Sequence, residues 1–179
     1  MTRASKARQE QANLLLPEFL PYRIAVVARA ISNELAQRYS DSGITNPEWR
    51  VIAHLADVVT CSSGDICQRT SMDKATVNRA LGRLVAGGLV LAEVSSQDRR
   101  LNVLTLTARG KALHQVIVPL ALDVEAQLTE TLTPEEKAVL FRAISKLDRR
   151  VEDIRLAREA STLNEINASK RRQNKRTPQ

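Results

Sequence analysis

The sequence predicts a mainly α-helical fold that carries one small β-hairpin. Three observations support this prediction. Apolar residues recur at three- and four-residue spacing in several segments, as they do along one face of a helix. Polar capping residues and early prolines stand at the starts of these segments. Residues 89–94 and 101–107 instead form short β-type runs, and the polar stretch between them is typical of a hairpin tip.

Length and composition narrow the class of protein. The chain has 179 residues, 43% of them apolar, which is enough for one domain or a compact pair of lobes. No apolar run approaches the roughly 18 residues of a membrane-spanning helix, and the N-terminus lacks the apolar stretch of a signal peptide. Aromatic residues make up 3%, too few for stacking on single-stranded nucleic acid. We therefore expect a soluble, cytoplasmic, nucleoid-associated protein with no membrane partner.

The first two helices have recognisable starts. A helix is predicted to begin near Pro21, because proline suits a first helical turn, and to end near the polar cluster at residues 40–43. The segment Thr45-Asn46-Pro47-Glu48 combines a polar cap, an early proline and an acidic residue, and predicts a second helix that ends near Val59.

The next two helices form a pair joined by a short turn. Ser62 and Asp65 have capping-box spacing and open a helix of about eight residues. Asp73 caps the following helix, which presents an apolar stripe on one face and polar residues on the other before it stops at Gly87-Gly88. Two short helices with such a turn indicate a helix-turn-helix, whose second helix enters a DNA major groove.

The hairpin follows this pair directly and completes a winged helix-turn-helix. Its tip contains Asp98, Arg99 and Arg100, and a tip with two arginines suits the narrow minor groove, where negative potential is concentrated. Residues 62–111 hold eight Lys and Arg against four Asp and Glu, a net charge of +4 within a chain of +7. This basic segment is typical of a nucleic-acid footprint.

Two long helices are predicted after the wing. The first contains Pro119, and the second has apolar residues that step by four and three, a seam for a partner helix: Leu140, Ile144, Leu147, Val151 and Ile154. A homodimer built from the first and last helices would bury them. We therefore expect a flexible arm over 1–15, a helical dimerisation lobe over 16–44 and 108–158, a DNA-binding domain over 45–107, and a basic disordered tail over 159–179.

At this point the sequence resembles MarR-family transcriptional regulators over about residues 16–158. Asp98-Arg99-Arg100, followed after three residues by Leu104-Thr105-Leu106-Thr107-Ala108-Arg109-Gly110, matches the wing pattern of that family. The segment Met72–Arg79 is similar to the family's recognition-helix sequence, and the two matches lie at the expected mutual spacing.

The resemblance implies roles in binding an operator in double-stranded DNA. Arg100 would insert into the minor groove, with Asp98 pairing to it and Arg99 beside it at the tip. Thr76 and Arg79, with Asn78 beside them, would face base edges or phosphates in the major groove. The remaining contacts would go to phosphates, which set affinity but carry no sequence information: Lys74, Arg83, Ser62 and Ser63. For the two serines, simple helix capping is an equal alternative.

A small-molecule effector is also expected. Leu20–Arg23 and Pro47–Arg50 are similar to segments of a MarR subgroup that controls the catabolism of aromatic compounds and responds to phenolic acids or hydroxycinnamoyl-CoA thioesters. Arg50 and His54 lie four residues apart and can face one pocket. The candidate effector residues are Tyr22, Arg23, Trp49, Arg50 and His54. Each has a structural alternative. These are core packing for Trp49, an interlobe ion pair for Arg50, a satisfied structural histidine for His54, and the dimer seam for Tyr22 and Arg23.

Other functions have less support. Cys61 or Cys67 could make the chain a thiol-based redox-sensing regulator of the same fold, but no basic residue adjoins Cys61 to lower its pKa. With two histidines 60 residues apart, no Gly-rich phosphate loop and no metal-ligand cluster, we expect no catalytic site, no cofactor and no metal. His114 lies off the apolar stripe of its helix and is predicted to be on the surface. The sequence thus predicts a ligand-responsive DNA-binding regulator, acting as a repressor, and not an enzyme.

Overall fold

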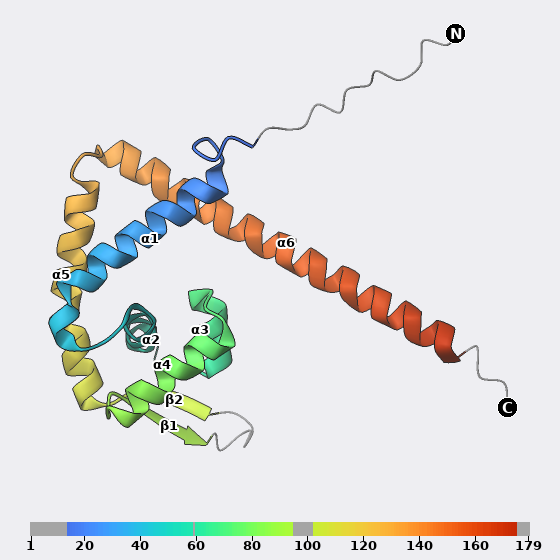
Figure 1. The fold of residues 1–179 in the computed structure, drawn as a ribbon, viewed down its shortest axis with the longest axis horizontal. Coiled ribbons are helices and arrows are strands. Elements are labelled where there is room, and N and C mark those ends of the chain that lie inside the picture. The colour runs from blue at the N-terminus through green and yellow to red at the C-terminus, as the bar shows by residue number, and fades with distance from the viewer. Residues whose placement is uncertain (1–13, 59, 95–101, 175–179) are drawn as a thin grey trace, which may run out of the picture. The chain divides into compact units, whose positions relative to one another are not determined.

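The computed structural model describes residues 14–58, 60–94 and 102–174, and Figure 1 shows their arrangement as helices with one two-stranded sheet. The mainly helical class with a small β-wing is confirmed. The elements in chain order are α1 (Leu20–Arg38), a short 3-10 turn (Ser40–Ser42), α2 (Asn46–Asp57), α3 (Ser63–Thr70), α4 (Lys74–Ala86), β1 (Val90–Val94), β2 (Asn102–Leu106), α5 (Ala108–Thr129) and α6 (Pro134–Asn174).

The chain divides into two compact units, one that ends at Glu125 and one that begins at Ala126. The first unit holds α1 to α4, both strands and most of α5, and α6 belongs to the second. These boundaries differ from the predicted lobes. A dimerisation lobe is defined by a second chain, so that assignment stays a prediction.

The helices α2, α3 and α4 begin at the capping residues that the sequence indicates. Thr45 and Ser62 each form a capping box with the acidic residue three positions later. The carboxylate of Asp73 accepts a hydrogen bond from the backbone N–H of Thr76, at 2.8 Å. These bonds satisfy N–H groups that have no partner within a helix, which is why three short helices can follow one another closely.

The core of the first unit lies between α2, α4 and the sheet. Val51 and Ile52 are fully buried on α2, and Val77 and Leu84 on α4. Ile66 of α3 and Ile117 of α5 close the cluster. The buried positions on α4 repeat at helical spacing, so its other face is left to solvent.

The hairpin is antiparallel, with Val90 opposite Leu106 and Val94 opposite Asn102. Cys61, which precedes α3, pairs with Leu104 of β2 through two backbone hydrogen bonds of 3.4 and 2.9 Å. The middle of β2 is therefore anchored to the segment that precedes α3. The predicted tip, residues 95–101, lies outside the described residues.

The end of the wing motif docks α5 against the turn that follows α4. The hydroxyl of Thr107 donates to the carbonyl of Gly88 at 2.8 Å and accepts from the backbone N–H of Gly110 at 3.0 Å. A Cβ atom on Gly110 would lie 2.1 Å from the carbonyl oxygen of Leu89, closer than any side chain permits. Glycine is therefore required at this position for packing.

The sixth helix is longer than the sequence predicts. Disorder is expected from residue 159, but α6 continues to Asn174. Residues 135–176 contain neither glycine nor proline and are rich in strong helix formers. Arg155 also pairs with Glu159 across the expected boundary, at 2.6 Å. Few apolar residues occur in this segment, but helix propensity does not require burial.

Candidate nucleic-acid interface

The outer face of α4 is polar and open to solvent. Asn78, Arg79 and Lys74 are exposed, while Thr76 is half-buried at the first turn of the helix. These residues were predicted to share one face, and the burial of Val77, Ala80 and Leu84 on the opposite face agrees with that prediction.

Thr76 and Arg79 form a local hydrogen-bonded group with the helix cap. The hydroxyl of Thr76 donates to the Asp73 carboxylate at 2.7 Å, and Arg79 Nη2 donates to the Thr76 hydroxyl at 3.1 Å. The side-chain hydrogen bond from Thr76 holds the pKa of Asp73 below its usual value. The group fixes the rotamers of two polar side chains on the exposed surface of α4, which favours directional contacts.

Arg83 differs from the other basic residues of this face because it already has an acidic partner. Its Nε–H donates to Glu48 Oε1 in α2, and its Nη2 lies 3.4 Å from the Thr45 hydroxyl. Its side chain is nevertheless 59% exposed. Sequence reasoning placed Arg83 among the phosphate contacts and did not foresee the partner, since Glu48 lies 35 positions earlier.

The two serines at the start of α3 are half-buried. The hydroxyl of Ser62 accepts from the backbone N–H of Asp65 at 3.2 Å and donates to its carboxylate at 2.8 Å. These bonds support the capping alternative for Ser62, and its phosphate contact stays a prediction. Asp98, Arg99 and Arg100 lie outside the described residues.

None of the five predicted effector residues lines the cavity described below, and their role stays a prediction. Tyr22 and Arg23 are exposed on α1, and Trp49 is buried in the core. Arg50 Nη2 donates to the Ser32 hydroxyl at 3.2 Å and so links α2 to α1. His54 is half-buried, and among the described side chains its Nε2 is a buried atom with no hydrogen-bond partner.

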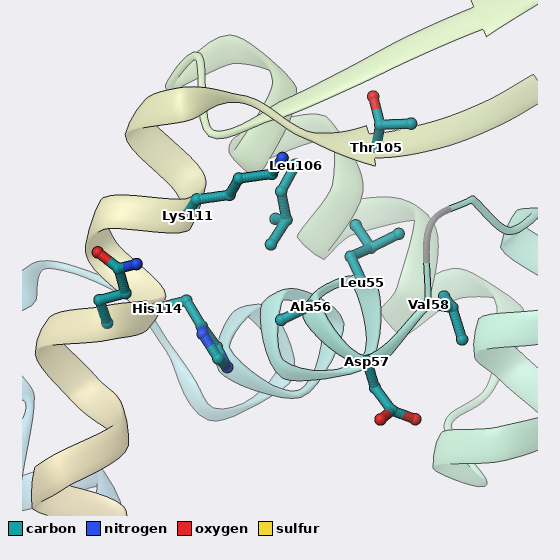
Figure 2. Close-up of a pocket in the computed structure, with 9 residues that line it drawn as sticks. Leu55, Ala56, Asp57, Val58, Thr105, Leu106, Lys111 and His114 are labelled. Carbon is teal, nitrogen blue, oxygen red and sulfur yellow. The ribbon is translucent and has the colours of Figure 1, made fainter.

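A cavity of about 600 Å³ instead lies between the end of α2, β2 and the first turns of α5. Figure 2 shows Lys111 and His114 projecting from α5 toward α2 and the strand. The lining is completed by Leu55, Ala56, Asp57, Val58, Thr105, Leu106 and Gln115. It combines an apolar wall with the ammonium of Lys111, the imidazole of His114 and the carboxylate of Asp57, a composition that suits a small ligand with an apolar body and polar substituents.

His114 is not the surface residue that the sequence predicts. It is half-buried, and its ring stacks on Trp49 with centroids 5.7 Å apart and planes at 20°. The apolar stripe of α5 gave no sign of this, because the partner comes from α2. Lys111, His114 and Gln115 are spaced at i, i+3 and i+4 and so lie on one face of the helix, which was the available signal.

Cys61 lacks the environment of a reactive thiol. Burial, together with the nearby carboxylate of Asp65, raises the pKa of Cys61, and a raised pKa lowers the fraction of nucleophilic thiolate. Cys67 is half-buried beside the core. In the described part of the chain no cluster of side chains is arranged to hold a metal ion, and no helix there is long and apolar enough to cross a membrane.

Comparison with known proteins agrees with this architecture. A model of the MarR family matches residues 42–101. An HTH-type transcriptional repressor of Mycobacterium tuberculosis is 28% identical over 129 residues, which cover 72% of this chain and 91% of that protein.

Solved structures show the same fold. BpsR of Bordetella bronchiseptica, studied for the regulation of its DNA binding by 6-hydroxynicotinic acid, is 26% identical with a TM-score of 0.69, covering 76% of this chain and 97% of that one. A mutant MarR of Escherichia coli in complex with operator DNA is 25% identical with a TM-score of 0.67, covering 75% and 99%.

The matched proteins are transcription regulators and not enzymes. The matched family model spans α2 to β1, and the structural likeness extends over three quarters of the chain. The chain therefore has the fold of the MarR-family winged helix-turn-helix transcriptional regulators, and it is similar to them in sequence.

Proposed function

We propose that this protein is a repressor that binds an inverted-repeat operator as a homodimer and is released by a small aromatic acid. The observation that carries the proposal is the unit formed by α3, α4 and the β1–β2 hairpin, in which α4 buries one face and exposes Asn78 and Arg79 on the other, with Thr76 half-buried beside them. A helix held in this way can enter a major groove. Operator binding by the E. coli MarR mutant supports the same use of the fold.

The predicted DNA contacts divide into two kinds. Thr76 and Arg79 have fixed side-chain positions and suit base edges, whereas Lys74 is exposed at the start of α4 and suits a phosphate. Arg100 and its neighbours Asp98 and Arg99 are proposed to reach the minor groove, as the family resemblance implies. Two such domains about 34 Å apart would read an inverted repeat.

Exposed apolar side chains support the homodimer. The α6 seam, Leu140, Ile144, Leu147, Val151 and Ile154, has between 39 and 65% of each side chain exposed. On α1, Ile24, Val27 and Ile31 are exposed as well. Apolar residues at this spacing are typical of a helix that packs against a partner helix, and a twofold dimer is the commonest assembly that supplies one.

The cavity beside α5 is the proposed effector site. Lys111 would pair with a carboxylate and His114 would hydrogen-bond a ring substituent, while Leu55 and Leu106 would contact the ring. A cavity of about 600 Å³ with one lysine suits a single-ring acid better than a CoA thioester, whose phosphates would need several cations. Trp49 does not line the cavity, but its ring stacks on His114, which does, so Trp49 is proposed to position that imidazole.

Release requires that the effector bind one conformation of the dimer better than the other. The cavity joins β2 of the wing to α5, so a ligand there would contact both elements. A coupling of about 1–3 kcal/mol would weaken operator binding roughly 5- to 150-fold.

The test is a mobility shift on DNA that flanks the protein's own gene, with and without phenolic acids, hydroxynicotinic acids and CoA thioesters. Arg79→Ala is expected to abolish specific binding. Lys111→Ala is expected to bind DNA as the wild type does, but to lose the response to the acid. Because Trp49 is the one tryptophan, its fluorescence reports ligand binding directly. Specific binding that no acid relieves would contradict the effector site, and an absence of specific binding would contradict the repressor.

A further inference from the structure

Glu48 occupies an unusual position for a carboxylate. Only 4% of it is exposed, and among the described residues it is the one charged side chain in the buried class. A buried charge is costly unless it is paired and hydrogen-bonded. Glu48 therefore needs partners that stay in place.

Those partners come from two sides. Oε2 accepts from the backbone N–H of Thr45 at 2.6 Å and from its hydroxyl at 2.8 Å. Oε1 accepts the Nε–H of Arg83, which lies on α4. Burial raises the pKa of Glu48, but the hydrogen bonds from Thr45 and Arg83 outweigh burial and lower it overall, so the carboxylate is ionised at neutral pH. Glu48 therefore takes part in the cap of α2 and, through Arg83, also links α4 to α2.

The apolar contacts between these helices have less directional preference than this ion pair. Val77, Ala80 and Leu84 fill the space beside α2, and such packing tolerates small rotations of a helix about its axis. A hydrogen-bonded charge pair does not, because its geometry must be kept to offset the cost of burial. Arg83 lies one turn beyond Arg79, so its tether also controls where Thr76 and Arg79 point.

We propose that the Glu48–Arg83 pair fixes the rotation of α4 on α2, and that Arg83 is a positioning residue for DNA recognition and not a phosphate contact. The proposal rests on the proposed function, since it concerns how α4 is presented to DNA. The proposal is testable because the two effects of Glu48 on DNA affinity are opposite. Its negative charge weakens DNA binding, whereas its hold on Arg83 strengthens operator binding.

The first test replaces the acid. Glu48→Gln removes a negative charge, and by charge alone it would strengthen DNA binding. A glutamine has one acceptor oxygen, so it cannot serve Thr45 and Arg83 together. We expect operator affinity to fall about tenfold, the size typical of residues coupled in one network, while affinity for unrelated duplex DNA is unchanged or higher. Tighter operator binding would overturn the proposal.

The second test compares two basic residues of α4. Lys74→Gln is expected to weaken operator and unrelated DNA equally, and to reduce the slope of log K against log salt by about 0.9, the value for one phosphate. Arg83→Gln is expected to weaken operator binding selectively and to leave the slope unchanged. Unfolding curves of both variants give the folded fraction in each assay, and the binding constants are corrected for it.

The possible outcomes distinguish the positioning role of Arg83 from the repressor function of the protein. An Arg83→Gln slope that falls as far as that of Lys74→Gln would make Arg83 a phosphate contact and overturn the positioning role, with the repressor function intact. Wild-type protein with no preference for any operator would overturn the proposed function and this role with it. Equal tenfold losses in Glu48→Gln, Arg83→Gln and the double variant would support a single shared interaction.

Discussion

The helices α2 and α6 use apolar residues in opposite ways. α2 has 12 residues and buries Trp49, Val51, Ile52 and Leu55 within the first unit. α6 has 41 residues, and none of its described side chains is buried. Both present apolar side chains at helical spacing, and those of α2 pack into the core of the first unit.

The difference shows that the two helices are stabilised by different interactions. A helix gains most of its stability from packing of its apolar face, so α2 is held by the core. α6 is supported by helix propensity and by pairs such as Arg155–Glu152 and Arg155–Glu159, which contribute little each because they are solvated. Its apolar seam is expected to be satisfied by a second chain.

The largest expected effect comes from making the same substitution in both helices. Ile52→Ala should lower the free energy of unfolding by about 2–5 kcal/mol, because Ile52 is fully buried and its loss leaves a cavity. Ile144→Ala, at a position 45% exposed, should act on self-association instead. Urea unfolding and sedimentation velocity measure the two quantities. If Ile144→Ala destabilises a monomer as much as Ile52→Ala does, the contrast between the helices is wrong.

A smaller effect is expected where α5 enters the first unit. Gly110→Ala should destabilise the fold by about 1–3 kcal/mol, because its Cβ would collide with the Leu89 carbonyl and force α5 to shift. Gly82→Ala is the matched control, since a Cβ there meets nothing within 4 Å. It should stabilise α4 by about 0.4–1 kcal/mol. Thermal unfolding distinguishes them by sign, and two shifts in the same direction would contradict this account of the junction.

The smallest effect expected is a pH dependence that differs between buried and exposed ion pairs. The pKa of Glu48 is lowered in the folded state, so its stabilising contribution is present above the ordinary glutamate pKa and is lost as pH falls through the folded pKa. Wild-type protein should therefore lose more stability than Glu48→Gln between about pH 6 and about pH 3.

The matched control for this pH dependence is Glu152→Gln on α6. The pKa of Glu152 is also lowered, by its hydrogen bond from Arg155, but solvent screens that pair. Its removal should hardly change the pH profile of unfolding. A change as large as that of Glu48→Gln would show that the location of the pair is unimportant.

Much of the candidate interface could be predicted from sequence because it depends on local signals. The caps Thr45, Ser62 and Asp73 act on N–H groups two or three positions away, so their spacing alone marks where α2, α3 and α4 begin. Burial of every third or fourth residue on α4 likewise leaves a defined outer face. The order of helices, strands and exposed polar residues is therefore encoded over short distances.

The pairing of Glu48 with Arg83, the stack of His114 on Trp49 and the contact of Gly110 with Leu89 join residues that are 35, 65 and 21 positions apart. No local pattern specifies such partners, because they depend on how α2, α4 and α5 pack. The sequence determined the helix-turn-helix, its wing and the polar face of α4. Only the tertiary structure decided that Arg83 pairs with Glu48 and that a cavity lies beside α5. Both features arise where side chains of separate elements meet.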